Sequence, residues 1–347
     1  MKILIIAPAD IRRGSIAKSI FDELKNFCSA VEFIGVENFY DSRSYFQRKI
    51  YKLGYRKFES DYNRNLTARL EAKYNEFQPD FILILDGTNI SLPVQKFLAR
   101  YKIILWLWDS FKRFDVLKNL VQIAAEIFCF EYEDIKNLRE EFSKSAYYLP
   151  LGVNEKIYYP AECERDIDIS FVGWTSKERL EILEKVCKFA VEKNLSVKIG
   201  GPFHDNKYFW KKILFRRRQK NLAQFLENRI FKPAEIAELY RRSKICLNIN
   251  VSEHHSLNPR TFEICATKSF QLMNSGQNSH GLINLETDLA TFDGAADLLE
   301  KIEFYLANDE LREKIALAGY NSVMKNCTVK KSVEKLFAES EILRGLK

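Results

Sequence analysis

Residues 247–274, with the sequence LNINVSEHHSLNPRTFEICATKSFQLMN, predict a strand, a polar loop, a helix and a second strand. The apolar run 245–251 is typical of a buried strand, and the loop after it holds two of the chain's four histidines. Asn258 followed by Pro259 predicts where the helix begins. Asparagine can cap the free amides of the first turn, and proline at the first helical position loses no hydrogen bond. The stretch therefore indicates a β–α–β unit of an α/β fold.

The beginning of this helix is a candidate site for a phosphate or a diphosphate. The amides of Arg260, Thr261 and Phe262 are expected to face the loop, and oriented amides and a guanidinium both favour anions. Glu263 lies one turn further along. From there its carboxylate can accept hydrogen bonds from both hydroxyls of a ribose, as acidic residues do in other nucleotide sites. The alternative is an ordinary buried βαβ unit in which Arg260 and Glu263 form a solvated pair.

A second glycine-containing loop has the same character. The expected strand 168–172 is followed by Gly173 and a helix over Lys177–Lys193, which again places backbone amides toward a ligand. Lys177 and Arg179, at the start of that helix, could add positive charge to a diphosphate site. The alternative is that they are ordinary surface residues of the helix, and this alternative is favoured for Lys177.

Length and composition indicate a two-domain globular protein. The chain has 347 residues, more than one hydrophobic core usually serves, with 46% hydrophobic and 13% aromatic residues. No apolar run reaches membrane-spanning length, and the opening MKILIIAPAD is too short for a signal peptide, so we expect a cytoplasmic protein. The net charge of +7 suits an anionic ligand or surface without specifying one. Seven cysteines without a CxxC pair indicate reduced core residues, among them Cys129, Cys187, Cys246 and Cys265.

Alternating strands and helices predict a doubly wound α/β architecture in both halves of the chain. The first half has expected strands at residues 2–7, 30–36, 80–86, 102–108, 126–130 and 146–149, and a helix at 15–27 preceded by a turn at Gly14. The second half has expected strands at residues 168–172, 195–200, 245–251, 269–273 and 289–292, and a last helix at 329–343. Residues 151–165 have linker composition.

Residues 207–226, KYFWKKILFRRRQKNLAQFL, predict a basic helix with aromatic and aliphatic side chains among its charges. Such a helix can lie on an anionic bilayer. The alternative, which the sequence favours, is a solvated basic face over an apolar stripe that packs into the core. No RNA- or DNA-binding signature accompanies the helix, so nucleic acid is not an expected partner.

Six separated pieces of the chain together resemble a GT-B glycosyltransferase of the "glycosyl transferases group 1" type, closest to the spore-maturation-protein-like transferases. The pieces are QPDFILILDG (78–87), ILWLWDS (104–110), YLPLGVNEKIYYP (148–160), DIDISFVGWTSKER (166–179), residues 248–272, and FDGAADLLEKIEFYLANDELREKIALAGYNSV (292–323).

The resemblance implies two Rossmann-like doubly wound domains that face a cleft. Residues 1–158 would form the acceptor-side domain and residues 159–326 the domain that binds the nucleotide-sugar donor, with residues 327–347 as a helix crossing back to the first domain. The implied activity is hexosyl transfer, with retention of configuration, from a nucleoside-diphosphate sugar to a hydroxyl acceptor. The acceptor would be a lipid-linked sugar or a growing glycan in bacterial surface polysaccharide, glycolipid or glycoprotein synthesis. No metal or other cofactor is expected, and peripheral contact with the inner face of the cell membrane is left open.

On the donor side, the resemblance implies that Glu263 binds the ribose, that Arg260 and the amides after Asn258 bind the diphosphate, and that Gly173 lies in the loop that approaches it. Arg260 would also stabilise the charge on the leaving nucleoside diphosphate. In the better-known members a second glutamate stands eight positions before Glu263, where this chain has His255.

On the acceptor side, the better-known members carry a histidine before an aspartate, where this chain has Trp108 before Asp109. An inverting transferase needs a base for the acceptor hydroxyl, and Asp109 is the candidate. The alternative is that Asp109 caps the turn after its strand. Gly14 would belong to the same side. Two rival functions stay open: a nucleotide-sugar epimerase of the same fold, and a degenerate GT-B module that binds a ligand without turnover.

Overall fold

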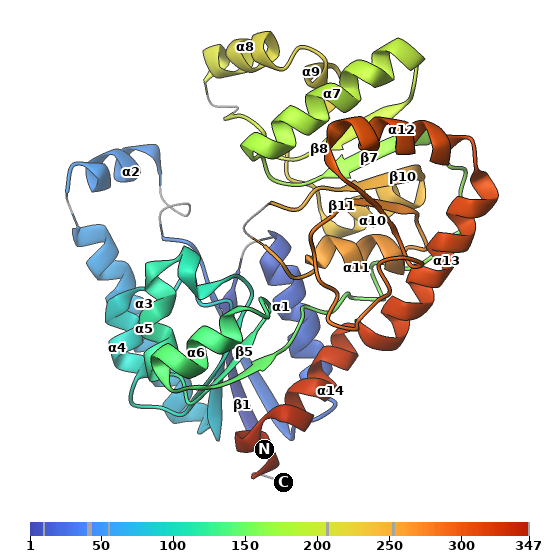
Figure 1. Cartoon of the computed structure of the whole chain (residues 1–347). Coiled ribbons are helices and arrows are strands. Elements are labelled where there is room, and N and C mark those ends of the chain that lie inside the picture. The colour runs from blue at the N-terminus through green and yellow to red at the C-terminus, as the bar shows by residue number, and fades with distance from the viewer. Residues whose placement is uncertain (10, 40–43, 55, 206–207, 252–253, 346–347) are drawn as a thin grey trace. The chain divides into compact units, whose positions relative to one another are not determined.

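The computed structural model describes residues 1–9, 11–39, 44–54, 56–205, 208–251 and 254–345. Within these residues it contains two six-stranded sheets in which all paired strands are parallel. The chain divides into two compact units (Figure 1). Unit 1 comprises Met1–Leu151 and Val329–Lys347, and unit 2 comprises Gly152–Thr328. The predicted doubly wound α/β architecture is confirmed.

The sheet of unit 1 has the strand order β2-β1-β3-β4-β5-β6. Its strands are β1 (Lys2–Pro8), β2 (Ala30–Val36), β3 (Phe81–Leu85), β4 (Ile103–Leu107), β5 (Glu126–Cys129) and β6 (Ser145–Tyr148). Its helices are α1 (Ile11–Leu24), α2 (Tyr45–Lys52), α3 (Lys57–Phe77), α4 (Leu92–Leu98), α5 (Asp115–Ile123), α6 (Asp134–Phe142), α14 (Val329–Glu339) and α15 (Glu341–Arg344), with a 3-10 turn η1 at Phe111–Arg113.

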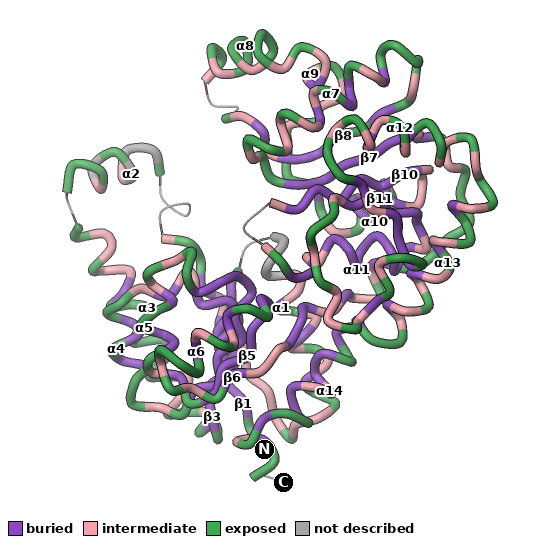
Figure 2. The backbone as a smooth tube through the Cα atoms, viewed as in Figure 1, coloured by how far each residue is buried: buried purple, intermediate pink, exposed green. Residues whose placement is uncertain are grey.

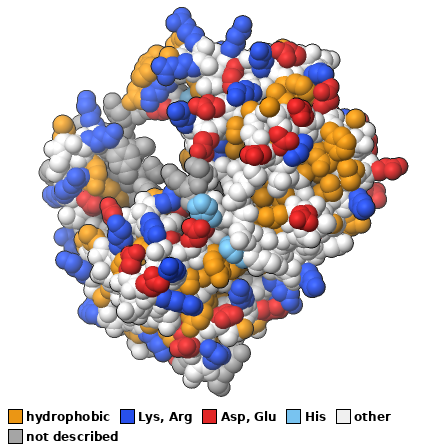
Figure 3. Space-filling model, viewed as in Figure 1, with side chains coloured by type: hydrophobic (Ala, Val, Ile, Leu, Met, Phe, Trp, Pro, Cys, Tyr) orange, Lys and Arg blue, Asp and Glu red, His pale blue; other side chains and the backbone are white. Residues whose placement is uncertain are grey.

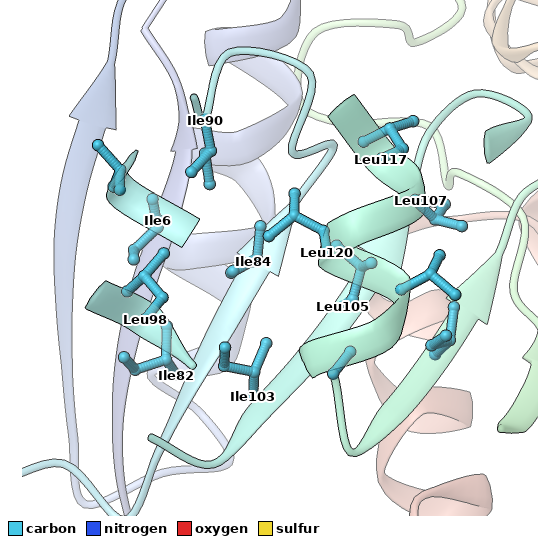
Figure 4. Packing of buried hydrophobic residues seen from close by; sticks show 14 of the residues in the cluster. Ile6, Ile82, Ile84, Ile90, Leu98, Ile103, Leu105, Leu107, Leu117 and Leu120 are labelled. Carbon is cyan, nitrogen blue, oxygen red and sulfur yellow. The ribbon is translucent and has the colours of Figure 1, made fainter. Parts of the chain in front are cut away.

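Both faces of this sheet are buried, which explains why its strands are continuous apolar runs. Alternate residues point to opposite faces, so Ile6 and Ile84 lie in one core while Ile5 lies in the other. Figure 4 shows the first core, in which Leu117 and Leu120 of α5 pack over the strands. The second core is covered by α1 and α14. In Figure 2 the strands appear as buried segments beneath more exposed helices.

The last helices belong to unit 1. Phe337 of α14 stacks on Phe27 with ring centroids 5.1 Å apart. The buried carboxylate of Glu126 accepts hydrogen bonds from the Ser340 hydroxyl (2.5 Å) and from the Ile342 amide (2.8 Å). The single helix predicted over 329–343 is therefore wrong in one respect. It breaks at Ser340, whose hydroxyl also caps α15 by accepting from the Leu343 amide.

The sheet of unit 2 has the strand order β12-β11-β10-β7-β8-β9. Its strands are β7 (Ile167–Val172), β8 (Val197–Gly200), β9 (Leu226–Glu227), β10 (Ser243–Asn248), β11 (Gln271–Asn274) and β12 (Ala290–Phe292). Its helices are α7 (Lys177–Lys193), α8 (Phe209–Arg218), α9 (Leu222–Phe225), α10 (Pro233–Arg241), α11 (Pro259–Ala266), α12 (Gly294–Leu306) and α13 (Asp309–Asn326).

The two ends of unit 2 lie side by side. Val153 forms a parallel β-bridge with Thr328, and its amide donates to the Cys327 carbonyl (2.8 Å). Arg165, in the segment with linker composition, donates hydrogen bonds to three carbonyls of unit 2, those of Arg241, Ser243 and Lys268. Much of this segment is therefore bound to unit 2.

Two further expectations about helices are wrong. Gly14 lies inside α1 rather than at a turn, because the helix already begins at Ile11. Glycine within a helix costs only about 1 kcal/mol relative to alanine, so tertiary context can override it. The helix predicted over 207–226 is divided into α8 and α9. The Glu184 carboxylate accepts from the amides of Asn221 and Leu222 and so starts a new helix there.

Most of the cysteines lie in the core as predicted, whereas Cys163 is exposed and Cys28 is half-buried. All seven cysteines are free, and the four singled out from the sequence are buried. Burial raises the pKa of Cys187 and of Cys246 to about 12, which makes both thiols unreactive at neutral pH. None of the helices in the described part of the chain combines the length and the apolar character needed to cross a bilayer.

Candidate functional site

A buried polar network lies at the carboxyl ends of β10 and β11. Asn248, the last residue of β10, is fully buried. Its Nδ2 donates to Thr261 Oγ1 (2.9 Å) and to Gln271 Oε1 (3.1 Å), and its Oδ1 accepts from Asn258 Nδ2 (2.9 Å). These bonds fix the beginning of α11 to the carboxyl edge of the sheet, which is where ligands bind in parallel α/β folds.

The predicted start of α11 is confirmed. Asn258 is the N-cap, and its Oδ1 accepts from the Thr261 amide (3.0 Å), with Pro259 at the first helical position. This cap uses one of the three amides that were expected to face a ligand. Phe262 is fully buried in the hydrophobic core, so its side chain has a packing role. The contribution of Thr261 to the site is therefore structural, through the cap and through its hydroxyl bond to Asn248.

Arg260 is held at the same edge. Its side chain is largely buried, with 8% of the residue exposed, and its Nη1 donates to Asn248 Oδ1 (3.1 Å). The guanidinium carbon lies 5.1 Å from the ring centroid of Phe171, in β7. A cation buried in this way needs compensating polar or aromatic contacts, which Asn248 and Phe171 supply.

Gly173 makes room for this guanidinium. A Cβ atom on Gly173 would lie only 2.7 Å from Arg260 Nη2. Gly201 packs on the same loop, since a Cβ there would lie 1.9 Å from the Gly173 carbonyl oxygen. The structure thus brings together Gly173 and Arg260, two residues that were predicted separately, and Gly201 is required by its close approach to the backbone at Gly173.

Arg179 joins this group, whereas Lys177 does not. The Arg179 side chain donates to the Ile249 carbonyl and to the Trp174 carbonyl, each at 2.9 Å, and its guanidinium carbon lies 5.8 Å from the Phe171 ring centroid. Two guanidiniums therefore lie near one aromatic ring. Lys177 is an exposed residue at the start of α7, as the alternative interpretation expected.

Glu263 lies three residues after Arg260 in α11, on the same side of the helix. Only 7% of the residue is exposed. Glu263 is thus a buried carboxylate one turn from the buried Arg260.

The acceptor-side candidates lie in unit 1. Asp109 follows β4, and both of its carboxylate oxygens accept from Arg113 Nη1, at 2.9 and 3.0 Å. Its Oδ1 also accepts from the Ser110 amide (2.9 Å), but the residue that caps the following turn is Ser110, whose hydroxyl accepts from the Lys112 amide. Trp108 packs in the core with 8% of the residue exposed.

A second buried acid, Asp134, escaped the sequence analysis. Its Oδ1 accepts from the Ser110 hydroxyl (3.0 Å) and its Oδ2 from the Phe111 amide (3.2 Å). Burial outweighs these bonds and raises the pKa of Asp134 to about 6. The only sequence signal was an acid in the first turn of a helix, which is a common position for a solvated residue.

Asp134 predicts a specific pH dependence of stability. Its pKa in the folded state is above the ordinary value near 3.9, so the folded chain binds more protons between about pH 4 and pH 6. The contribution of this group to the free energy of unfolding should therefore rise as the pH falls through 6. Chemical denaturation from pH 7 to pH 4.5 should show this rise relative to Asp134→Asn, which cannot titrate. Parallel pH profiles for the two proteins would contradict the assignment.

The sequence analysis also missed the amides of the network, namely Asn248, Asn250, Gln271 and Asn274. Asn250 N donates to Asn274 Oδ1 (2.6 Å), and the Asn258 side chain donates to Asn250. A signal was available, because polar residues interrupt the apolar runs ICLNIN and FQLMN, with Asn248 and Asn274 at the carboxyl ends of β10 and β11 and Gln271 at the start of β11.

The histidine loop is only partly described. His255 is exposed, and its carbonyl accepts from the Asn278 amide (2.7 Å), whereas Ser252 and Glu253 lie outside the described residues. Among the residues for which the structure gives positions, no three His, Cys, Asp or Glu side chains gather as metal ligands.

Comparisons with known proteins show which family model and which folds this chain resembles. Residues 179–338 match the family model described as glycosyl transferase-like. The spore protein CgeB of Bacillus subtilis (strain 168) is 23% identical over 282 residues, which cover 77% of this chain and 84% of that protein.

Two solved structures share the fold over nearly the whole chain. Sucrose-phosphate synthase from Thermosynechococcus elongatus has a TM-score of 0.71 at 10% identity and covers 100% of both chains. HepE of Anabaena, in complex with UDP-glucose, has a TM-score of 0.68 at 11% identity and covers 97% of this chain and 100% of its own. At these identities the likeness shows the fold. The chain thus has the GT-B fold, with two Rossmann-like units, and residues 179–338 are similar to the glycosyl transferase-like family model.

Proposed function

We propose that this protein transfers a hexose from a nucleoside-diphosphate sugar to a hydroxyl acceptor, with unit 2 as the donor-binding domain and unit 1 as the acceptor-binding domain. The observation that carries the proposal is the placement of Arg260 and Arg179 beside Phe171 and Gly173. Together with Glu263 one turn along α11, these groups offer positive charge for a diphosphate and a carboxylate for a ribose. The HepE complex makes UDP-glucose the first donor to test.

The main chemical task of this site is to stabilise the charge on the leaving group. When the sugar–phosphate bond breaks, negative charge develops on the leaving nucleoside diphosphate, and a guanidinium held ready at that position stabilises it. Arg260 is oriented by Asn248 and by the ring of Phe171, so little reorganisation is needed as the charge develops. Arg179, fixed by two backbone carbonyls, can share this role. The proposed reaction needs no metal, because these cations supply the charge.

For stereochemistry we propose retention of configuration. An inverting transferase needs a side chain to deprotonate the acceptor hydroxyl, whereas a retaining one does not. The carboxylate of Asp109 is held by Arg113 on both oxygens, which favours the retaining route. If the product is inverted, Asp109 is the base, and its pair with Arg113 must open for the acceptor. Proton NMR of the glycoside formed from an α-linked donor distinguishes the two outcomes.

Titration with a panel of nucleotide sugars, followed by assays with and without a hydroxyl acceptor, tests the proposed function. A transferase should bind one donor selectively and form a glycoside only when an acceptor is present. An epimerase would convert the sugar without an acceptor. A binding module would bind the donor and form no product. Either of the last two results would overturn the proposal. The acceptors to try first are lipid-linked sugars and glycans of bacterial surface polysaccharides.

We expect Glu263→Ala to weaken nucleoside binding by roughly 10- to 150-fold, because hydrogen bonds to a charged group contribute about 1.5–3 kcal/mol. The loss should be equal for a nucleoside and its diphosphate, since the ribose is common to both. Calorimetric titration of both ligands measures it. Glu300→Ala, at an exposed position of α12, is the matched control and should bind both ligands as the wild type does. A folded Glu263→Ala protein with unchanged affinity would remove Glu263 from the site.

A further inference from the structure

The helix α8 carries an apolar face that no part of the described chain covers. Phe209 and Trp210 are 76% and 58% exposed, and Ile213 and Leu214 are 38% and 39% exposed. None of the helix's residues is buried. The sequence favoured the opposite arrangement, with this apolar stripe packed into the core, and that interpretation is wrong.

The four exposed apolar side chains lie on one side of α8. With about 100° of rotation per residue, positions 209, 210, 213 and 214 fall within an arc of roughly 140°. Arg217 falls near the middle of this arc, and the other cations of the helix flank it. An amphipathic helix of a soluble protein usually turns such an arc toward the core. Here the arc faces outward.

The opposite side of α8 attaches the helix to unit 2. Phe215 is half-buried against the hydrophobic core that contains Phe171 and Phe203. Its ring lies 5.0 Å from the ring of His204. The side of α8 that carries Phe215 therefore packs against unit 2. The apolar face on the other side is exposed although the helix is attached to the fold.

The charge around this face specifies the partner. Residues 209–220, FWKKILFRRRQK, contain six basic side chains and no acidic one. Figure 3 shows Lys and Arg side chains together with hydrophobic side chains at the end of the molecule where α8 lies in Figure 1. Exposed aromatic and aliphatic side chains between cations are typical of a helix that lies in the interface of an anionic bilayer. The aromatic rings enter the headgroup region, while lysine and arginine reach the lipid phosphates.

We infer that α8 binds the surface of a membrane that contains anionic lipids, with Phe209, Trp210, Ile213 and Leu214 inserted and the surrounding cations at the headgroups. This inference concerns a surface apart from the candidate donor site, and it does not require transferase activity. A nucleic acid would also be attracted by the charge, but it offers nothing for the apolar side chains to enter.

Vesicle co-sedimentation measures this binding directly. The full chain should bind vesicles of phosphatidylcholine with 30% phosphatidylglycerol, and binding to vesicles of phosphatidylcholine alone should be far weaker. The triple variant in which Lys212, Arg216 and Arg218 are all changed to glutamine should bind roughly 100-fold more weakly. Each cation near the surface is expected to contribute about fivefold to the affinity. Lys185→Gln with Lys188→Gln, on the exposed side of α7, is a charge control that should leave binding unchanged.

Tryptophan fluorescence separates insertion from charge attraction. Trp106 and Trp108 are buried, so Trp174 and Trp210 are the exposed indoles. In Trp174→Phe, emission from Trp210 should shift to the blue on anionic vesicles and should be quenched by brominated acyl chains. In Trp210→Phe, emission from Trp174 should show neither effect.

Apolar truncation completes the test. Phe209→Ser with Leu214→Ser should abolish sedimentation, while Phe304→Ser, at a 51% exposed position of α12, should not. Because the altered side chains are exposed, both proteins should fold, which circular dichroism checks. Equal binding to neutral and anionic vesicles, an unquenched Trp210, or binding of an oligonucleotide without binding of vesicles would each overturn the inference.

Discussion

Arg260→Ala should lower the affinity for a nucleoside diphosphate by roughly 10- to 150-fold, because a lost hydrogen bond between charged groups costs about 1.5–3 kcal/mol. The affinity for the nucleoside alone should change little, whereas Glu263→Ala should weaken the nucleoside and its diphosphate equally. Sugar transfer should fall further than binding, since Arg260 also stabilises charge that develops only as the sugar leaves. Calorimetry with both ligands and a transfer assay at saturating donor measure the two effects.

Two control variants separate a role of Arg260 in phosphate binding from a role in the fold. Arg260→Lys retains a charge but loses the forked geometry, so it should recover part of the diphosphate affinity and little of the rate. Arg241→Ala removes an arginine at the end of α10, just before the opposite edge of the sheet, and should leave both ligands unaffected. Equal losses for nucleoside and diphosphate in Arg260→Ala would mean that the residue supports the fold rather than the phosphate site.

Trp106→Ala should lower the free energy of unfolding by about 3–5 kcal/mol, the usual cost of truncating a fully buried tryptophan. Trp106 is 0% exposed in the middle of β4, and its Nε1 donates to the Leu149 carbonyl (3.1 Å). The substitution leaves a cavity and a buried carbonyl without its donor. Denaturant unfolding followed by near-ultraviolet circular dichroism measures the change.

Trp174→Ala is the matched control, because Trp174 is 54% exposed. It should change the free energy of unfolding by less than about 1 kcal/mol. Similar destabilisation by both substitutions would argue against the packing described for β4.

Local signals were sufficient to predict most elements of this fold. The strand Ala30–Val36 and the helix Lys177–Lys193 have the predicted bounds, since apolar runs and helical periodicity are written in consecutive residues. The cap at Asn258 also follows from adjacent residues. Local sequence signals could not predict which side of α8 is buried. Periodicity identifies an apolar stripe, but only the tertiary structure decides what the stripe faces.

Local patterns also identified some residues of the candidate site, but not how they are arranged in space. Arg260, Glu263 and Gly173 were named from loop and helix patterns, but the contact between Gly173 and Arg260 was not predicted. Gly173 lies against Arg260 because β7 and β10 are neighbours in the sheet, which no local pattern contains. Asn248 was overlooked because an isolated amide in an apolar strand has many explanations until its partners are seen.

The division of unit 1 into two segments has a consequence for synthesis. The chain leaves this unit at Leu151 and returns at Val329, so the ribosome makes all of unit 2 before it makes α14. At typical rates of 5–20 residues per second, that interval lasts about 10 to 35 seconds. Throughout it, the face of the first sheet that later receives Val333 and Phe337 has no cover from the last helix. A nascent chain stalled anywhere in unit 2 should therefore be a chaperone client, and release of the last twenty residues should end that dependence.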